Sequence, residues 1–290
     1  MLLRFTRRCL KVFYTDLTSV LFSVMAVCIV IGIYILFLGD IWTDLAAGSL
    51  ENSREIMDCW IMGGSLAIIP VTSTLGAFSA MVDDRVRKIE KDLICSPLRR
   101  FHIAGGYILS AFSVGVIMSL LALILAEVYI VNNGGNPHTF EEILKLIGVI
   151  AYNGIFSTVA LYFIVSFFRS NGAFLTTSVV VGVLIGFFTG CYLPIGLLPE
   201  GVQNIVKMFP PSHAASLMRQ IMMKAPLDYA FSLDTGHTER DWFENFMGVK
   251  YIIDGEYTTA TQSLIFIGGA IALFLLAVAI KELFSRKRRG

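Results

Sequence analysis

The chain has 290 residues, of which 56% are hydrophobic and only 16% are charged, and its mean hydropathy is +0.72. This apolar share is above that of ordinary soluble domains and excludes a soluble globular protein. The formal net charge of +1 gives no sign of a nucleic-acid-binding surface, so nucleic acid is not expected as a partner. In membrane proteins the distribution of charge along the chain is more informative than the total.

Residues 1–15 are predicted to form an amphipathic helix that lies in the membrane interface. Its cationic residues recur at i, i+3, i+4 and i+7, and are Arg4, Arg7, Arg8 and Lys11. The segment also contains the apolar residues Leu3, Leu10, Phe13 and Tyr14. Each cation near an anionic leaflet contributes about 1 kcal/mol to membrane binding, so a surface anchor explains this segment.

Six apolar runs follow, and each has about the 20 residues that a helix needs to cross a hydrocarbon core. They cover 17–38, 59–82, 103–126, 146–168, 170–193 and 257–280, the fifth continuing as an apolar stretch to Pro199. The sequence therefore predicts an all-α polytopic membrane protein, with a six-helix transmembrane domain over residues 16–284.

Six spans place both termini on one side of the membrane, and the positive-inside rule identifies that side. Sixteen of the 23 Lys and Arg residues lie in the segments that share a side with the termini, including the basic tail 285–290. We therefore expect both termini in the cytoplasm and the protein in the plasma membrane.

The loop 83–102, between the second and third spans, carries charges of both signs up to Ser96-Pro97. A residue before proline is disfavoured in a helix, so we expect a short amphipathic helix ending near Ser96, with Ile89 and Leu93 as its apolar stripe. A solvated charged loop is the alternative interpretation.

The same loop, with its acidic residues, its Ser-Pro-Leu-Arg-Arg and the following Gly105-Gly106, resembles the first cytoplasmic loop of type-2 ABC exporter permeases. The resemblance implies that the loop docks onto a cytosolic ATPase. Lys88 stands where many members of that family carry glycine. The residues expected to couple to the ATPase are Asp84, Arg85, Arg87, Glu90, Lys91, Ser96, Pro97 and Leu98.

In the fifth span Gly182, Gly186 and Gly190 recur at intervals of four. Such a strip of small residues lets transmembrane helices pack closely. The resemblance implies that the first and fifth helices of two subunits meet around the transport path, which makes these glycines candidates for subunit packing. A contact within one subunit is equally consistent with the spacing.

The segment 194–256 is expected outside the cell. Its breaks resemble the short outer helices of the same family, which predicts a re-entrant helix pair that gates the outer mouth. The gate candidates are Pro194, Pro199, Pro210, Pro211 and Arg219. The acidic and aromatic stretch 225–256 is either a small external cap or a solvated loop. Its Asp234, His237, Glu239 and Asp241 lack a recognised metal-ligand spacing, so no metal is expected.

Four features within or near the spans have more than one interpretation. Glu127 follows the third span and is either a functional polar site or an interfacial carboxylate. Pro70 and Asn153 are expected to loosen or pair locally within the bundle. Cys59 and Cys191 would pair only if the fold brings them together.

None of the nine lysines precedes Ser or Thr, so the chain lacks a P-loop and cannot hydrolyse ATP by that route. No H-E-x-x-H or G-x-S-x-G motif is present, so we expect a non-catalytic subunit, with ATP and Mg²⁺ bound by the partner. The resemblance implies the permease of an ATP-driven ABC exporter, with two ATPase copies and a second permease as homodimer or heterodimer. The cargo would be amphiphilic: a drug, peptide antibiotic, lipid or lipid-linked glycan. An ion-coupled carrier or a channel is the alternative.

Overall fold

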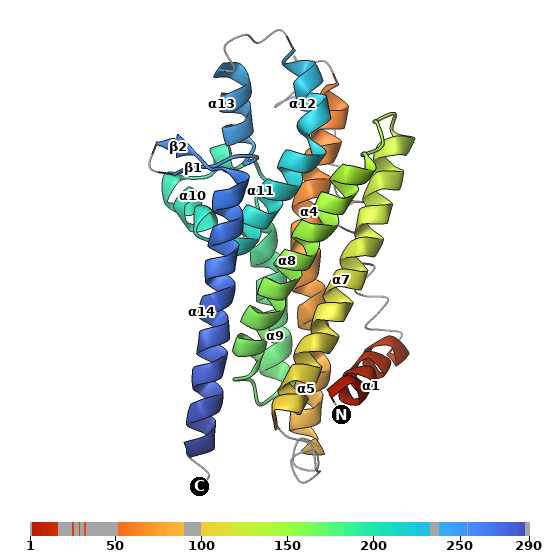
Figure 1. The fold of residues 1–290 in the computed structure, drawn as a ribbon, viewed down its shortest axis with the longest axis vertical. Helices are drawn as coiled ribbons and strands as arrows, with labels where there is room; N and C mark the ends of the chain where they lie inside the picture. Colours follow the sequence, from red (N-terminus) through yellow and green to blue (C-terminus); the bar gives the residue numbers. More distant parts are fainter. Residues whose placement is uncertain are drawn as a thin grey trace.

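The computed structural model describes residues 2–16, 25, 29, 32, 52–89, 100–232, 238–253 and 255–287. These residues form an elongated helical bundle (Figure 1), in agreement with the prediction of a mostly helical polytopic membrane protein. The predicted first span, 17–38, lies almost wholly outside the described residues. The end at which α1 and the C-terminus lie is called the terminal end, and the opposite end the distal end.

Five helices in the described residues are long and apolar enough to cross a membrane. Their segments are α4 (Ser53–Ala77) with α5 (Ser79–Val86), α7 (Arg100–Asn132), α8 (Phe140–Val165), α9 (Asn171–Phe188) and α14 (Ala260–Lys287). The continuous segment Ser53–Val86 has 34 residues and is therefore about 50 Å long. Since a hydrocarbon core is only about 30 Å thick, charged residues at both ends of this segment lie outside it.

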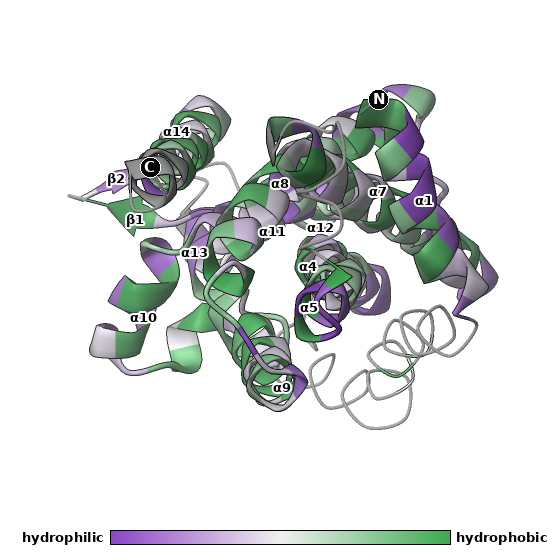
Figure 2. Ribbon diagram, turned by 90° about the horizontal axis from the view of Figure 1, so that it is seen from below, coloured by the Kyte–Doolittle hydropathy of each residue, from purple (hydrophilic) through white to green (hydrophobic). Residues whose placement is uncertain are grey.

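Helix α4 lies at the centre of the bundle (Figure 2), in contact with α7, α8, α9 and the short helix α11. Its most apolar window is 78% buried, whereas the windows of α9 and α14 are only 17% buried. A helix that is apolar all round belongs in a core or in lipid. Helix α4 is thus the core helix, and α9 and α14 present apolar faces outward.

Pro70 lies inside α4, where proline cannot donate a backbone hydrogen bond and weakens the helical ladder. The buried Asn153 of α8 donates from Nδ2 to the carbonyl oxygen of Ala67 at 2.9 Å, three residues before the proline. The predicted local pairing of Asn153 within the bundle is therefore confirmed.

The helix ends differ from the predicted span ends because hydropathy does not detect caps. Helix α8 begins at Phe140, six residues before the predicted start, since Thr139 and Glu142 form a reciprocal capping box. Helix α9 ends at Phe188, before the predicted limit of 193. Gly190 there adopts a φ of 60°, a left-handed conformation that ends helices.

Helix α1 (Leu2–Thr15) lies where the amphipathic helix is predicted, and one of its faces packs against the bundle. The buried residues are Phe5, Thr6, Cys9 and Phe13, while Leu3 is 73% exposed. Packing against α7 selects this face: Phe5 lies edge-on to Tyr107 at 5.1 Å, above Gly106, where an added Cβ would come within 2.3 Å of the Phe5 ring.

The chain after α9 forms a series of short elements, most of them at the distal end (Figure 1). They are η2 (Ile195–Leu197), α10 (Glu200–Lys207), α11 (Pro210–Met222), α12 (Lys224–Ala230), α13 (Thr238–Phe246), β1 (Ile252–Ile253) and β2 (Glu256–Tyr257). The two strands pair antiparallel with Ile252 opposite Tyr257, a small exception to the all-α prediction. In its described part the stretch 225–256 is a folded cap and not a solvated loop.

Candidate functional site

Three consecutive charged residues on α5, Asp83, Asp84 and Arg85, bind three different parts of the bundle at the terminal end; we call them the α5 cluster. Asp84 accepts two hydrogen bonds from the Arg8 guanidinium of α1, at 2.8 and 2.9 Å. It also accepts one from the Tyr107 hydroxyl of α7, at 2.6 Å. Bidentate arginine–carboxylate pairs are among the strongest polar contacts in proteins, so Arg8 fastens α1 to α5.

Arg85 and Asp83 fasten the connection between α8 and α9. The Arg85 Nη1 donates to the carbonyl oxygens of Ser166 and Phe168, at 3.1 and 2.8 Å. These carbonyls follow the last turn of α8, where a cation also meets the negative end of the helix dipole. Asp83 accepts from the side-chain amide of Asn171, the first residue of α9, at 2.6 Å.

The cluster contains two residues of the predicted ATPase-coupling set. Asp84 is buried and Arg85 partly buried, and both bind other parts of the bundle. Arg87 is exposed, and Lys88 after it adopts a φ of 63°. That left-handed conformation favours glycine, which agrees with the glycine noted in the resembled family. Glu90, Lys91, Ser96, Pro97 and Leu98 lie outside the described residues.

Prolines open the short helices that follow α9. Pro194 precedes η2, Pro199 precedes α10, and Pro210 and Pro211 occupy the first turn of α11. Proline suits the start of a helix because the N–H groups there have no acceptor within the helix, so the N–H that proline lacks is not missed. Helix α11, almost entirely buried, contacts α4, α8 and α14.

Arg219 on α11 lies inside the protein. The sequence assigned it to the outer gate, but its side chain does not line an open mouth. It is only 1% exposed. Its guanidinium donates to the carbonyl oxygens of Trp60, Thr189 and Gly190, at 3.2, 3.2 and 2.7 Å. The last two follow the end of α9, so the cation again lies at the negative end of a helix dipole.

Residues of α4 shape the space for this guanidinium. It lies over the Trp60 ring at 4.6 Å from the centroid, a favourable cation–π geometry. Gly64 leaves the necessary room, since a Cβ there would come within 2.5 Å of the Arg219 Nη2. The Trp60 indole in turn donates to the carbonyl oxygen of Met247 at 2.7 Å, which joins α4 to the cap.

The three glycines of the fifth span do not form the predicted continuous strip. Gly190 lies beyond the end of α9. A Cβ on Gly186 would come within 2.2 Å of the Tyr192 ring of the same chain, so that glycine serves an internal contact. Only Gly182 faces open space.

Glu127 forms an ion pair that the sequence did not reveal, with Nδ1 of His138 at 2.7 Å. The other ring nitrogen lies 3.1 Å from the carbonyl oxygen of Met222 at the end of α11. Burial lowers the pKa of His138, but the hydrogen bond and charge of Glu127 outweigh burial and raise that pKa above its ordinary value. The loop between α7 and α8 is thereby tied to α11.

The candidate pair Cys59 and Cys191 does not form a disulfide. Cys59 and Cys191 are free buried thiols, and the Cys191 sulfur lies 3.7 Å from the Ser65 hydroxyl. Asp234 and His237 lie outside the described residues.

The Arg8–Asp84 pair should show a favourable coupling energy. We expect Arg8→Gln and Asp84→Asn to destabilise the protein non-additively, with a coupling of about 1 to 2 kcal/mol, measured by unfolding in mixed detergent micelles. The exposed Arg7 on the same helix supplies the control, because Arg7→Gln and Asp84→Asn should be additive. Additive effects of Arg8→Gln and Asp84→Asn would contradict the pairing.

Gly64→Ala should displace Arg219 from its carbonyl partners. Overpacking of this kind lowers the free energy of unfolding by about 1 to 3 kcal/mol, and we expect a lower melting temperature. Gly148 of α8 has open space around it, so Gly148→Ala should leave stability unchanged or slightly raised. Equal melting temperatures for the two variants would refute the steric argument.

The Glu127–His138 pair predicts a pH-dependent contribution to stability. Because the folded state raises the pKa of His138, the contribution is complete below the ordinary value of 6.5 and is lost as the pH rises through the raised pKa. Glu127→Gln should therefore lower the melting temperature more at about pH 6 than at about pH 9. The control, Glu141→Gln on the exposed side of α8, should show no such difference; a Glu127→Gln effect that is equal at both pH values would exclude the linkage.

The sequence matches one known protein family over most of its length. Residues 48–280 match the family described as ABC-2 family transporter protein, whereas no curated protein matches the chain. The match covers the candidate spans up to residue 280 and the cap, and it does not include α1. The chain therefore belongs to the ABC-2 transporter family, as a multi-pass membrane permease of an ABC transporter.

Proposed function

We propose that the chain is the permease of an ATP-driven exporter, and that a separate ATPase docks on the segment 83–102. The observation that carries the proposal is the α5 cluster, which lies where this segment leaves the bundle. ATP and Mg²⁺ are bound by the ATPase, because the chain has no P-loop lysine.

The α5 cluster supports a transmitting role. The exposed Arg87 is available to a partner, while Asp84 binds α1 and α7 one turn earlier. Arg85 and Asp83 bind the α8–α9 connection. A displacement of the docked segment therefore acts on four helices through short polar contacts.

The membrane arrangement that we propose has six spans, with residues 17–38 as the first and both termini in the cytoplasm of a plasma-membrane protein. The terminal end then faces the ATPase, and the cap lies outside the cell. Two permeases and two ATPases form the transporter. The outward apolar faces of α9 and α14 suit subunit packing and an amphiphilic cargo better than a hydrated ion path.

Helices α10 and α11 are the proposed outer gate. Pro194 and Pro199 flank η2, which precedes α10, and Pro210 begins the buried α11. In this arrangement Arg219 holds α11 in place, and movement of α10 opens the mouth. The residue therefore supports the gate without lining it.

Charge reversal at Arg87 should separate docking from folding. We expect Arg87→Glu to reduce the ATPase that co-purifies with the tagged permease about tenfold, the scale of one lost charge-assisted contact. Lys145→Glu at the distal end is the matched control and should retain the ATPase.

Asp84→Asn should retain the bound ATPase but lower transport, because it breaks transmission and leaves the docking surface intact. Normal ATPase retention by Arg87→Glu would place the docking surface elsewhere. Loss of the ATPase from both variants would show that the cluster serves docking only.

A further inference from the structure

Three helices of the bundle end at a nitrogen donor from another part of the chain. Arg85 binds carbonyl oxygens that follow α8, and Arg219 binds those that follow α9. At the end of α11, Nε2 of His138 lies 3.1 Å from the carbonyl oxygen of Met222. Arginine stays protonated at every pH that a folded protein meets, whereas histidine changes charge near neutral pH. Of these three contacts, the one at α11 is therefore the one that a proton can control.

The carbonyl group of Met222 cannot accept the usual α-helical hydrogen bond. Its donor would be the N–H of the residue four positions later, but that residue is Pro226, which has no N–H. Met222 is only 1% exposed, and a buried carbonyl without a donor is costly. His138 therefore binds a group that the chain leaves open at the junction of α11 and α12.

Both ring nitrogens of His138 face acceptors. Nδ1 lies 2.7 Å from the Glu127 carboxylate, and Nε2 faces the Met222 carbonyl oxygen. Neutral imidazole has a single N–H, so the ring can donate to both partners only when it is protonated. Its side chain is 6% exposed, which leaves little access for water to replace a lost partner. The neutral ring must therefore give up one of the two contacts.

The charges near the ring favour its protonated form. Burial lowers the pKa of His138, but Glu127 and Glu142 raise it, and the balance lies above the ordinary value. Other charged groups near the loop have partners of their own: Arg54 pairs with Asp58 at 3.5 Å. Arg219, one turn before Met222, directs its charge to the end of α9. The charged residues that α4, α7, α8, α11 and α12 place around this loop are Arg54, Glu55, Asp58, Glu127, Glu142, Arg219 and Lys224.

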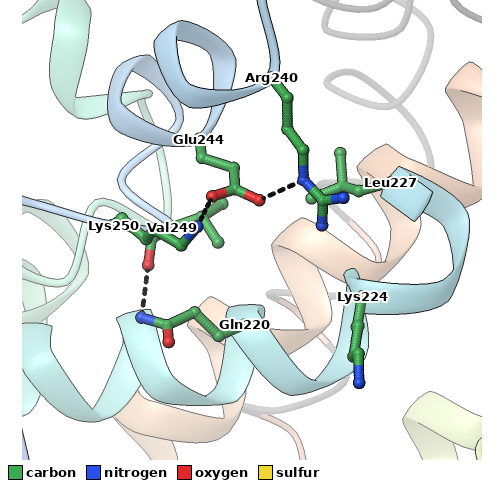
Figure 3. A pocket seen from close by; sticks show the side chains of 7 residues that line it. All are labelled: Gln220, Lys224, Leu227, Arg240, Glu244, Val249 and Lys250. Carbon is green, nitrogen blue, oxygen red and sulfur yellow. Dashed lines mark hydrogen bonds and ion pairs between the residues drawn. The ribbon is translucent and has the colours of Figure 1, made fainter. Parts of the chain in front are cut away.

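The junction of α11 and α12 is also attached to the cap. Gln220, two residues before Met222, donates to the carbonyl oxygen of Val249 at 3.0 Å (Figure 3). On α12, Asp228 accepts from Arg240 of α13 at 2.7 Å. A contact made or lost at Met222 therefore acts on a segment that binds the cap on both sides.

We propose that Glu127, His138 and Met222 form a proton-controlled latch between the α7–α8 loop and the end of α11. The protonated ring closes the latch. When the ring passes a proton to water, Nδ1–H stays with Glu127, because a carboxylate is a stronger acceptor than a carbonyl, and Nε2 releases Met222. The latch therefore opens as the pH rises. That it responds to the external pH rests on the proposed function, which places the distal end outside the cell; the latch itself does not.

Nitrogen-15 NMR of the histidine-labelled, full-length protein in non-ionic detergent tests the protonation step, with His138→Gln to assign the signals. We expect Nε2 to lose its proton above the ordinary pKa of 6.5, while Nδ1 keeps its own. Glu127→Gln should lower this midpoint by about 1 pH unit or more. His102→Gln, at the terminal end of α7, should leave it unchanged. Loss of the proton from Nδ1 instead would mean that the contact with α11 persists and would overturn the proposal.

Hydrogen exchange measured by mass spectrometry tests the release of the junction. After correction for intrinsic exchange rates, the protection of the amides in residues 223–228 should fall about tenfold between about pH 6 and pH 9, the scale of one lost charge-assisted contact. The fall should be absent from His138→Gln and retained by His102→Gln. Equal protection at both pH values in the wild type, or an equal fall in His138→Gln, would refute the latch. Neither measurement uses ATPase or cargo, so a failure of the proposed function would leave both results interpretable.

Discussion

The buried guanidinium of Arg219 is the constraint on which the distal half of the structure depends. Removing a charge from water costs several kcal/mol unless polar partners replace the lost hydration. Here the partners are three backbone carbonyls and the face of Trp60. They come from α4 and from the end of α9, so α11 is satisfied only when both helices are in place. The Trp60 indole, bound to Met247, extends the same requirement to the cap.

Both ends of the bundle satisfy helix termini with arginine. Arg85 donates to the carbonyl oxygens that follow α8, and Arg219 donates to those that follow α9. Each cation meets carbonyls that helix geometry leaves without partners. Near the middle of the bundle, the Asn153 side chain donates to the carbonyl oxygen three residues before Pro70. This contact supports a helix that proline weakens and does not fix a helix end.

Hydropathy predicted the five described spans because an uncharged run of about 20 residues has few alternatives in a membrane. It could not place their ends, which depend on the Thr139–Glu142 cap and on the left-handed Gly190. Nor could helical spacing choose the buried face of α1, which Gly106 and Tyr107 of α7 determine. Arg219 was recognised as important but assigned to a gate, because its partners are backbone carbonyls, one of them 159 residues away, and a carbonyl has no sequence signature.

Helix α9 is held differently from its neighbours. Its apolar window is only 17% buried, so side-chain packing within this chain contributes little to its position. Polar contacts instead hold its two ends: Asn171 binds Asp83 at the start, and Arg219 binds the carbonyls after its last turn. A helix fixed at its ends and free along its length moves as a rigid rod when either end moves. The polar contacts therefore run from α5 to α11 by way of the two ends of α9, and they bypass the apolar core, which resists deformation because it is closely packed.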